Sequence, residues 1–457
     1  MFHTSRLTKA SLGLVLGLAA STALAAITPQ QAEQLKTTLT PMGAERAGNA
    51  AGTIPAWTGG ITQAPAGYKP GQHHPDPYAA DKPLFTITKA NLDQHKAHLS
   101  PGQIALFNSY PDTFQMPIYP SRRSGSAPQW LYDNTLKNAT SAKLLEGGSG
   151  FSDAYGGVPF PVPKDGVEVL WNHITRYRGI YVVRRASEAP VQRNGSFALV
   201  TSQQEALFNY YRPNGQFADL KNILFYYLAF VKSPARLAGG AALVHETLDQ
   251  LKDARQAWIY DAGQRRVRRA PNLAYDTPIA SSDGLRTADD TDLFNGSPDR
   301  YDWKLKGKQE IYIPYNNYKV ASPEVKYAQL LTPGHLNPQY TRYELHRVWV
   351  VEGNLKPGSR HIYSKRVLFL DEDSWGAALV DQYDGRGELW RVSMAYLKNF
   401  YDLPTTWSAL DVFHDLQARR YYVQNLDNEE AETVDFAQPV PEDAYFMPSA
   451  LRQRGTR

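Results

Sequence analysis

The sequence predicts a mainly β protein, built on one large antiparallel sheet that follows a long, irregular N-terminal arm. After residue 166 the chain becomes a succession of short stretches in which Val, Ile, Tyr, Phe and Trp alternate with polar residues, as expected of strands. Turns of only a few residues join several of these stretches. Short connections require antiparallel neighbours, because a parallel pair needs a long crossover. With 42% hydrophobic residues in a chain of 457, a sizeable core is available.

Residues 1–25 have the pattern of an export signal. Arg6 and Lys9 precede an apolar run at 10–20, and a small-residue cleavage pattern ends at Ala25. The run is shorter than the roughly 20 apolar residues that span a bilayer. We therefore expect cleavage near Ala25 and release of the mature chain into the periplasm. A retained membrane anchor is the alternative.

Residues 26–165 are rich in Pro, Gly, Ser and Asn and are expected to form an extended arm with short helices. Helical patches are predicted at 29–38 and at 88–106. Elsewhere, as in "YPDTFQMPIYPSRR" and "GGVPFPVP", Pro is too frequent for helix interiors or central strands. Widely separated aromatic residues predict an arm laid across another surface, with Trp57 as an anchor; a disordered linker is the alternative.

The antiparallel half-barrel is expected at 166–395. Two interruptions, 270–308 and 319–342, mix short helical patches with turn residues, are too long for hairpin loops and are predicted to be lids. Residues 396–457 are expected to begin with a short helix and to wrap back onto the sheet as a Pro-containing tail. The predicted strands lie near 167–176, 179–186, 196–210, 222–231, 236–248, 255–261, 264–269, 309–318, 343–353, 361–371, 376–383 and 387–395.

Several motifs in one order resemble a known bacterial family. "LTPMGAERAGNAAGTIPAWTGG" near the N-terminus resembles the entry motif of the domain-of-unknown-function 1329 family, and the similarity continues through "WIYDAGQRRVRRAP", "RYDWKLKGKQEIYIPYN" and "RVLFLDEDSW". The resemblance implies an incomplete barrel similar to the periplasmic lipoprotein carrier and the outer-membrane lipoprotein receptor, whose concave side holds acyl chains. It also implies work with exporters of the resistance-nodulation-division type. It implies no catalytic residues.

A lipid-holding sheet needs an apolar concave side. In "NILFYYLAFV" both faces of the predicted strand are apolar, so the strand must be covered on both sides, one cover being a lid or the arm and the other a ligand. A filled core under the lid is the alternative. The face of the sheet to which each side chain points depends on the strand register, because a slip of one residue moves every side chain to the other face. The candidate apolar lining consists of Trp171, Tyr181, Val183, Phe225, Tyr227, Trp258, Tyr260 and Trp349.

"GQRRVRRAP" is the most strongly charged segment. On a strand, Arg266 and Arg268 fall on one face and Arg265 and Arg269 on the other, so the segment is not a one-sided stripe for a polyanion. A solvated edge strand is the simplest interpretation. Contact of Arg266 and Arg268 with an anionic headgroup or an acidic partner is the second, and nucleic acid is not expected.

Catalytic and metal-binding patterns are weak. The chain has no Cys, which excludes disulfides, thiolate nucleophiles and Cys-ligated metals, and no His cluster has a third ligand fixed by spacing. We predict no metal and no cofactor. The acidic run Asp371, Glu372 and Asp373 is the one enzymatic alternative, since paired carboxylates perform acid–base chemistry in hydrolases.

The sequence therefore predicts a periplasmic binding or carrier protein for a lipidic or other hydrophobic molecule. An inner-membrane exporter and an outer-membrane protein are the expected partners. Two alternatives are a non-transport adaptor, whose sheet and arm bind a protein partner and whose core is full, and a hydrolase.

Overall fold

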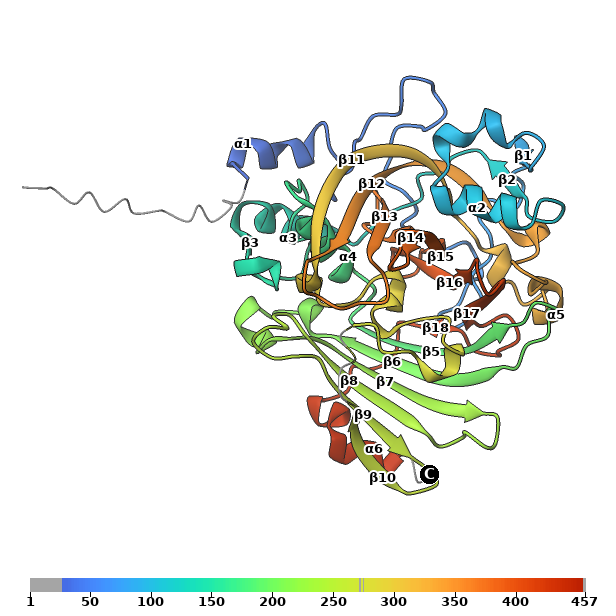
Figure 1. Cartoon of the computed structure of the whole chain (residues 1–457). Helices are drawn as coiled ribbons and strands as arrows, with labels where there is room; N and C mark the ends of the chain where they lie inside the picture. The colour runs from blue at the N-terminus through green and yellow to red at the C-terminus, as the bar shows by residue number, and fades with distance from the viewer. Residues whose placement is uncertain (1–26, 271–272, 274, 455–457) are drawn as a thin grey trace, which may run out of the picture.

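The predicted fold class is confirmed by a computed structural model, which describes residues 27–270, 273 and 275–454. The protein is mainly β, and one large sheet that does not close into a barrel runs through it (Figure 1). The strand order is β1-β2-β12-β13-β14-β15-β16-β17-β5-β6-β7-β8-β9-β10, with β11 paired to β12 and β18 to β5. The predicted export signal lies outside the described residues. Within them, no helix is both long and apolar enough to cross a membrane.

The elements have the following bounds. The first strands are β1 (Phe85–Ile87), β2 (Met116–Tyr119), β3 (Lys143–Leu144), β4 (Phe151–Ser152), β5 (Tyr181–Val191), β6 (Val200–Phe208), β7 (Ile223–Ser233), β8 (Ala241–Thr247), β9 (Gln256–Asp261) and β10 (Arg266–Ala270). The others are β11 (Tyr301–Pro314), β12 (Tyr343–Leu355), β13 (Lys365–Asp371), β14 (Ala377–Tyr383), β15 (Leu389–Phe400), β16 (Thr405–Asp415), β17 (Arg420–Leu426) and β18 (Val434–Asp435). The α-helices are α1 (Pro29–Ala32), α2 (Pro101–Ser109), α3 (Gln129–Ser141), α4 (Gly166–Ile174), α5 (Tyr327–Leu330) and α6 (Pro448–Arg454).

The prediction of a strand at 167–176 is wrong, because this segment is helix α4. The side chain of Asp165 caps the helix by accepting a hydrogen bond from the backbone N–H of Glu168 at 2.9 Å. Apart from Val167, every residue of α4 is buried. Glu168 and Asn172 lie one helical turn apart on one face of α4, but the helix is only nine residues long, so its apolar residues also fit the pattern of a short buried strand.

The C-terminal prediction is also wrong in its first part. Residues 396–426 hold no helix: they complete β15 and form the central strands β16 and β17. Both strands show a usable signal, since "TTWSALDVFHD" and "RYYVQNL" are rich in β-branched and aromatic residues and are joined by a turn of four residues, 416–419. The sheet is mixed and not purely antiparallel, because β2 of the arm pairs in parallel with β12.

The two faces of the sheet are distinguished by what covers them. On its inner face, Arg366, Gln382 and Arg391 stand in register and bond to the connection between β10 and β11. We call residues 275–300 of this connection, which include the 3-10 helices η7 (Ala280–Ser282) and η8 (Ala288–Leu293), the inner lid. In Figure 1, β11 to β13 form an arch, with α4 inside it. The predicted lid at 270–308 is thus shorter than expected, because β11 begins at Tyr301.

The second predicted lid, 319–342, lies on the outer face. Tyr421 of β17 points to this side, opposite Tyr422, and its hydroxyl donates to the carbonyl of Thr332 at 3.0 Å. The C-terminal segment also covers the outer face, where Phe446 and Leu451 pack against strands β5 to β9. Only one of the two insertions therefore covers the concave side.

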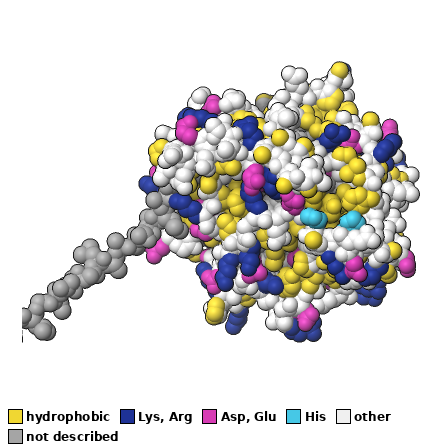
Figure 2. Space-filling view, turned by 90° about the horizontal axis from the view of Figure 1, so that it is seen from above, with side chains coloured by type: hydrophobic (Ala, Val, Ile, Leu, Met, Phe, Trp, Pro, Cys, Tyr) yellow, Lys and Arg dark blue, Asp and Glu magenta, His cyan; other side chains and the backbone are white. Residues whose placement is uncertain are grey.

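The N-terminal arm also packs on the outer face of the sheet. At the start of α2, the backbone N–H of Gly102 and the hydroxyl of Ser100 donate to the carboxyl of Asp381 on β14, at 3.0 and 3.1 Å. A Cβ at Gly102 would lie 2.1 Å from that carboxyl, so only glycine allows this approach. Seen over the arm and β11, the surface mixes acidic, basic and apolar side chains without a patch of one charge (Figure 2).

Replacing Asp381 with Asn should change the pH dependence of stability. Burial raises the pKa of Asp381 to about 7, and the hydrogen bonds from Gly102 and Ser100 offset it only in part. The folded state then holds a proton that the unfolded chain, with a pKa of about 3.9, releases. The contribution of this carboxyl to the free energy of unfolding therefore falls as pH rises from about 4 to about 7, by up to about 1.4 kcal/mol per pH unit.

Asn carries no such proton, so the free energy of unfolding of the variant, minus that of the wild type, should increase over this pH range. Urea denaturation of both proteins in steps from about pH 4.5 to about 7.5 measures the difference, in which all other titrating groups cancel. A pH-independent difference would show that Asp381 stays ionised in the folded protein.

Candidate functional site

The space under the arch is filled by helix α4. Its Trp171 is completely buried, with its indole N–H donating to the carbonyl of Gly148 at 3.0 Å. The C-terminal end of α4 is fixed by His173, whose pKa is lowered to about 3 by burial, so that the ring is neutral. Nε2 of this ring donates to the carbonyl of Asp292 at 3.0 Å and Nδ1 accepts from the N–H of Ala377 at 3.1 Å. The helix thus bonds to both the inner lid and the sheet.

Buried ion pairs hold the inner lid in place. Asp292 bonds to the guanidinium groups of Arg176 and Arg178, next to α4. Burial alone would raise the pKa of Asp292, but the two arginines outweigh it and hold this pKa well below its usual range. Asp289 pairs in the same way with Arg366 at 2.8 Å. The inner face over β13 to β17 is therefore covered by charged and hydrogen-bonded groups. Among the residues that the structure describes, the continuous apolar hollow expected of a carrier is not found there.

An apolar section of the inner face remains open on β7 to β9. Tyr227 stands in register with Val244, and Ala229 with Ala242 and Ile259. These five residues, here called the apolar platform, are partly exposed, and Ile259 is 49% exposed. The platform crosses strands that lie about 4.8 Å apart.

The platform lies on the same face as the inner lid. Asn295 of the lid donates to the carboxylate of Glu246 at 3.2 Å, and Glu246 is two residues from Val244 on β8, where alternate residues share a face. On the opposite face of this strand, His245 bonds to the carbonyl of Phe446 at 2.8 Å. The lid and α6 thus lie on opposite sides of the sheet.

The eight residues of the predicted lining do not share one surface. Phe225 and Tyr227 are on the inner face. Trp171 belongs to α4, and Trp349 stacks on Trp375, which bonds to the arm at Met42. The other four are on the outer face, in contact with or next to residues covered by Phe446 and α6: Tyr181, Val183, Trp258 and Tyr260. As one continuous lining, the predicted set is wrong, although Tyr227 is part of the platform.

The arginine-rich segment is an edge strand, as its charge pattern indicated. β10 ends the strand order of the large sheet, and Arg266 and Arg268 are both exposed. Arg268 stands in register with Ile259, so this residue borders the apolar platform, and its guanidinium donates to Gln264 in the β9–β10 turn. A hydrophobic strip with a cation at its edge can accommodate an apolar tail and an anionic group together.

Trp57 lies between two segments of the arm. Its indole N–H donates to the carbonyl of Gly125 at 2.8 Å, and the guanidinium of Arg46 lies 5.3 Å from its ring centroid. Trp57 remains partly exposed. The role of Trp57 as an anchor of the arm stays a prediction.

The acidic run does not open into a cleft. Asp371, Glu372 and Asp373 are 0%, 1% and 5% exposed. Glu372 accepts from Arg347 at 2.7 Å, and Asp373 accepts from Arg123 at 2.7 and 2.9 Å. Glu372 and Asp373 neutralise buried arginines and tie the arm to the strand end, which is a structural role. Asp371 accepts from the hydroxyls of Tyr315 and Ser374 at 3.1 and 2.6 Å.

One group of three side chains has the spacing of metal ligands. Ligand atoms of His346, Asp371 and Asp373 lie within 4.8 Å of one another, all buried. Asp373 is already neutralised by Arg123, whose positive charge would repel a cation at the same place. We therefore interpret these three side chains as a hydrogen-bonded cluster and not as a metal site.

Sequence reasoning missed most of the platform and the whole ionic attachment of the lid. Ala229, Ala242 and Val244 are small and give little signal beyond their alternation. Asp289 and Asp292 lie in "TADDTDLF", which reads as an ordinary polar turn. Their arginine partners are at least 70 residues away in the chain, so no local pattern connects them.

Together, the fold and its inner face define a class of protein with an open, curved sheet. The concave side of this sheet is partly filled by a helix and a lid, and the rest is exposed as an apolar strip. The chain belongs to the family described as protein of unknown function DUF1329, whose model matches residues 86–452. It is 49% identical to the uncharacterized protein PA3922 of Pseudomonas aeruginosa over 448 residues, 97% of each chain.

Three solved structures are similar in part. A putative outer membrane lipoprotein-sorting protein domain from Vibrio parahaemolyticus is 16% identical, with a TM-score of 0.44 over 63% of this chain and 98% of that one. A DUF1329 family protein from Desulfovibrio piger is 17% identical, with a TM-score of 0.41 over 60% and 92%. The LolA superfamily protein NE2245 from Nitrosomonas europaea is 13% identical, with a TM-score of 0.37 over 62% and 98%.

Proposed function

We propose that this protein is a periplasmic binding or carrier protein for a lipidic or other hydrophobic molecule. Its proposed partners are an inner-membrane exporter of the resistance-nodulation-division type and an outer-membrane protein, and it carries the molecule between them. The observation that carries the proposal is the apolar platform on the concave side of the sheet. Ile259 exposes 49% of its surface there, beside Arg268 on the neighbouring strand. The export signal pattern of residues 1–25 supports the location.

The physical reason for a carrier is the cost of exposing alkyl chains to water. Each CH₂ group moved from an apolar environment into water costs about 0.8 kcal/mol, so a chain of about sixteen carbons faces a barrier of roughly 13 kcal/mol. A platform that replaces water along part of the chain lowers this barrier. Because α4 and the inner lid fill the arch, cargo is proposed to bind along β7 to β9 and not under the arch.

Native mass spectrometry of the protein purified from its own periplasm, with lipid extraction, tests the proposal. A stoichiometric hydrophobic molecule released by organic solvent is the expected result. Protein that carries no such molecule and also fails to bind fluorescent acyl probes would contradict it.

Replacing Ile259 with Asp is expected to weaken the binding of a fluorescent acyl probe about tenfold or more, since full burial of such a side chain contributes about 1.5–3 kcal/mol. The exposed site tolerates the change without loss of folding. Leu251→Asp is the matched control, because Leu251 is 62% exposed in the β8–β9 turn, away from the platform. Equal affinities of the two variants would show that the platform is not the binding surface.

A second candidate function is an adaptor that binds a protein partner and transports nothing. The filled arch favours it, because Trp171 and the ion pairs of Asp289 and Asp292 leave no room for cargo there. An adaptor would bind its partner protein but no fluorescent acyl probe. The hydrolase alternative has no comparable support, since all three acids are buried, Glu372 and Asp373 pair with arginines, and Asp371 is hydrogen-bonded by Tyr315.

A further inference from the structure

Six turns of the large sheet come together at one rim. The antiparallel register places the β5–β6, β7–β8, β9–β10, β12–β13, β14–β15 and β16–β17 turns at the same end of the strands. For example, Tyr421 at the start of β17 pairs with Val191 at the end of β5, and Ala241 at the start of β8 pairs with Tyr260 near the end of β9. We call these six turns the hairpin rim: residues 192–199, 234–240, 262–265, 356–364, 384–388 and 416–419.

The hairpin rim is basic and the opposite rim is acidic. The six turns hold seven Lys and Arg against two Asp and Glu, a net charge of +5. The connections at the opposite ends of the strands hold seven Lys and Arg against eleven Asp and Glu, a net charge of −4; these are 209–222, 248–255, 315–342, 372–376, 401–404 and 427–433. A chain of nearly balanced total charge is thus polarised along its strands. Such a field orients the molecule in front of a charged surface.

Acidic groups of the neighbouring lid do not cancel this charge. Asp283 pairs with Arg420, the first residue of β17, at 2.6 Å, and Asp276 lies 3.9 Å from Arg300. Each of these acids thus faces an arginine outside the six turns. The basic residues of the turns themselves remain exposed at Arg193, Arg236, Arg265, Arg360, Arg386 and Arg419.

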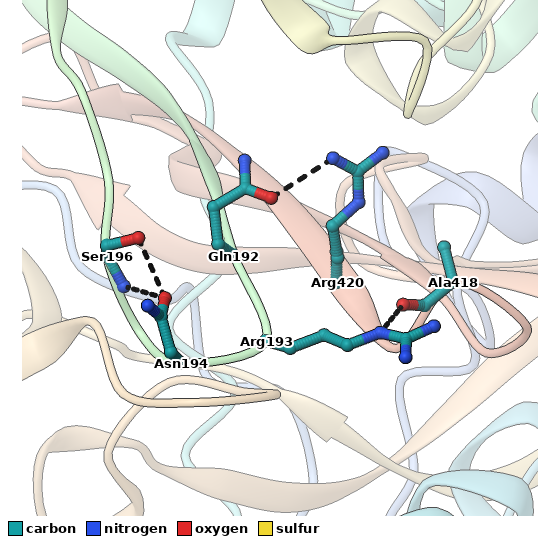
Figure 3. Close-up of a pocket in the computed structure, with 6 residues that line it drawn as sticks. All are labelled: Gln192, Arg193, Asn194, Ser196, Ala418 and Arg420. Atoms are coloured by element: carbon teal, nitrogen blue, oxygen red, sulfur yellow. Dashed lines mark hydrogen bonds between the residues drawn. The ribbon is translucent and has the colours of Figure 1, made fainter.

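A polar hollow of about 440 Å³ opens on this rim, between the β5–β6 and β16–β17 turns (Figure 3). Its lining carries the guanidinium group of Arg193 and that of Arg420, the second of which is paired with Asp283. The lining residues are Gln192, Arg193, Asn194, Ser196, Ala418 and Arg420. Arg193 is oriented by a hydrogen bond from its Nε to the carbonyl of Ala418 at 2.7 Å. In the part of the chain that the structure describes, its two Nη groups have no hydrogen-bond partner. A guanidinium edge with free N–H groups matches a phosphate oxygen pair.

We propose that the hairpin rim docks on an anionic phospholipid surface and that the hollow at Arg193 receives one phosphate headgroup. Charge spread over six turns suits the diffuse negative potential of a membrane surface. Each Lys or Arg near that surface contributes about 1 kcal/mol of binding free energy. The apolar Leu237, 38% exposed beside Arg236 in the β7–β8 turn, also suits a membrane interface. The inference goes beyond the proposed function, because docking does not depend on cargo.

The test is co-sedimentation of the mature chain with vesicles of phosphatidylglycerol and phosphatidylcholine, and with vesicles of phosphatidylcholine alone. We expect binding to the anionic vesicles only, and its loss as salt rises from about 50 to about 300 mM. The triple variant Arg193→Glu, Arg236→Glu, Arg360→Glu should lower the partition coefficient at least tenfold. Cargo binding, measured with the acyl probe, should stay unchanged in this variant.

The matched control reverses three exposed lysines of the opposite rim: Lys221→Glu, Lys252→Glu and Lys326→Glu. Both triple variants change the total charge equally, so only the position of the charge differs, and circular dichroism checks that both fold. Equal binding by the two variants, or equal binding to the two vesicle types, would overturn the proposal and assign the rim to an acidic protein surface.

Discussion

Replacing Arg123 with Met is expected to lower the free energy of unfolding by about 3–5 kcal/mol, because it leaves buried carboxylates without their counter-charge. Arg123 is 7% exposed and bonds to Asp373 through Nε and Nη2 at 2.9 and 2.7 Å. Its Nη2 also donates to the carbonyl of Glu45 at 2.8 Å, so the same guanidinium holds the arm. Urea denaturation measures the loss of stability.

The same variant should expose the arm to proteases. Arg123 also contacts the carbonyls of Arg46, Ala47 and Pro55, so this stretch of the arm loses several of its hydrogen bonds without it. Limited proteolysis followed by mass spectrometry should show new cleavage between residues 45 and 57.

Arg122→Met is the control, because it changes the same type of side chain one residue earlier. The Arg122 side chain is 45% exposed and pairs with Asp81 at 2.7 Å, and exposed pairs of this kind contribute only about 0.2–1 kcal/mol. Similar losses of stability in the two variants would contradict the assignment of Glu372 and Asp373 as structural, arginine-neutralised carboxylates.

Replacing Trp171 with Ala should cost about 3–5 kcal/mol of stability, since it removes the largest side chain of α4 and leaves a cavity. Trp171 is 0% exposed, and its ring lies 5.6 Å from that of Phe151. The cavity would be apolar and would sit under the arch. We expect the variant to bind a small apolar probe that the wild type excludes, as apolar cavities do.

Trp130→Ala in α3 is the control for this experiment. Trp130 is 38% exposed and packs edge to face against Tyr177 at 5.3 Å, so its removal should cost less than half as much and create no closed cavity. Thermal unfolding and probe titration of both variants give the comparison. A wild-type protein that already binds the apolar probe under the arch would show that α4 moves out, and cargo would then have a second site.

The sequence by itself determined the family, the β class and most strands. Eleven of the predicted strands overlap observed ones, because alternating faces and short turns leave a strong local pattern. The edge position of β10 was also evident, from Arg266 and Arg268 on one face and Arg269 on the other. Local chemistry decided these features, so a local pattern could report them.

Only the tertiary structure decided the site. Phe225 and Tyr260 have equal aromatic character, yet one faces the inner lid and the other faces α6, because register sets the face of every side chain. Helix α4 is only nine residues long, so its apolar residues also fit a short strand, and its Trp171 fills the arch that cargo was expected to occupy. The basic rim arises from turns that are far apart in the chain and meet only when the strands pair, because electrostatic fields add in space and not along the sequence.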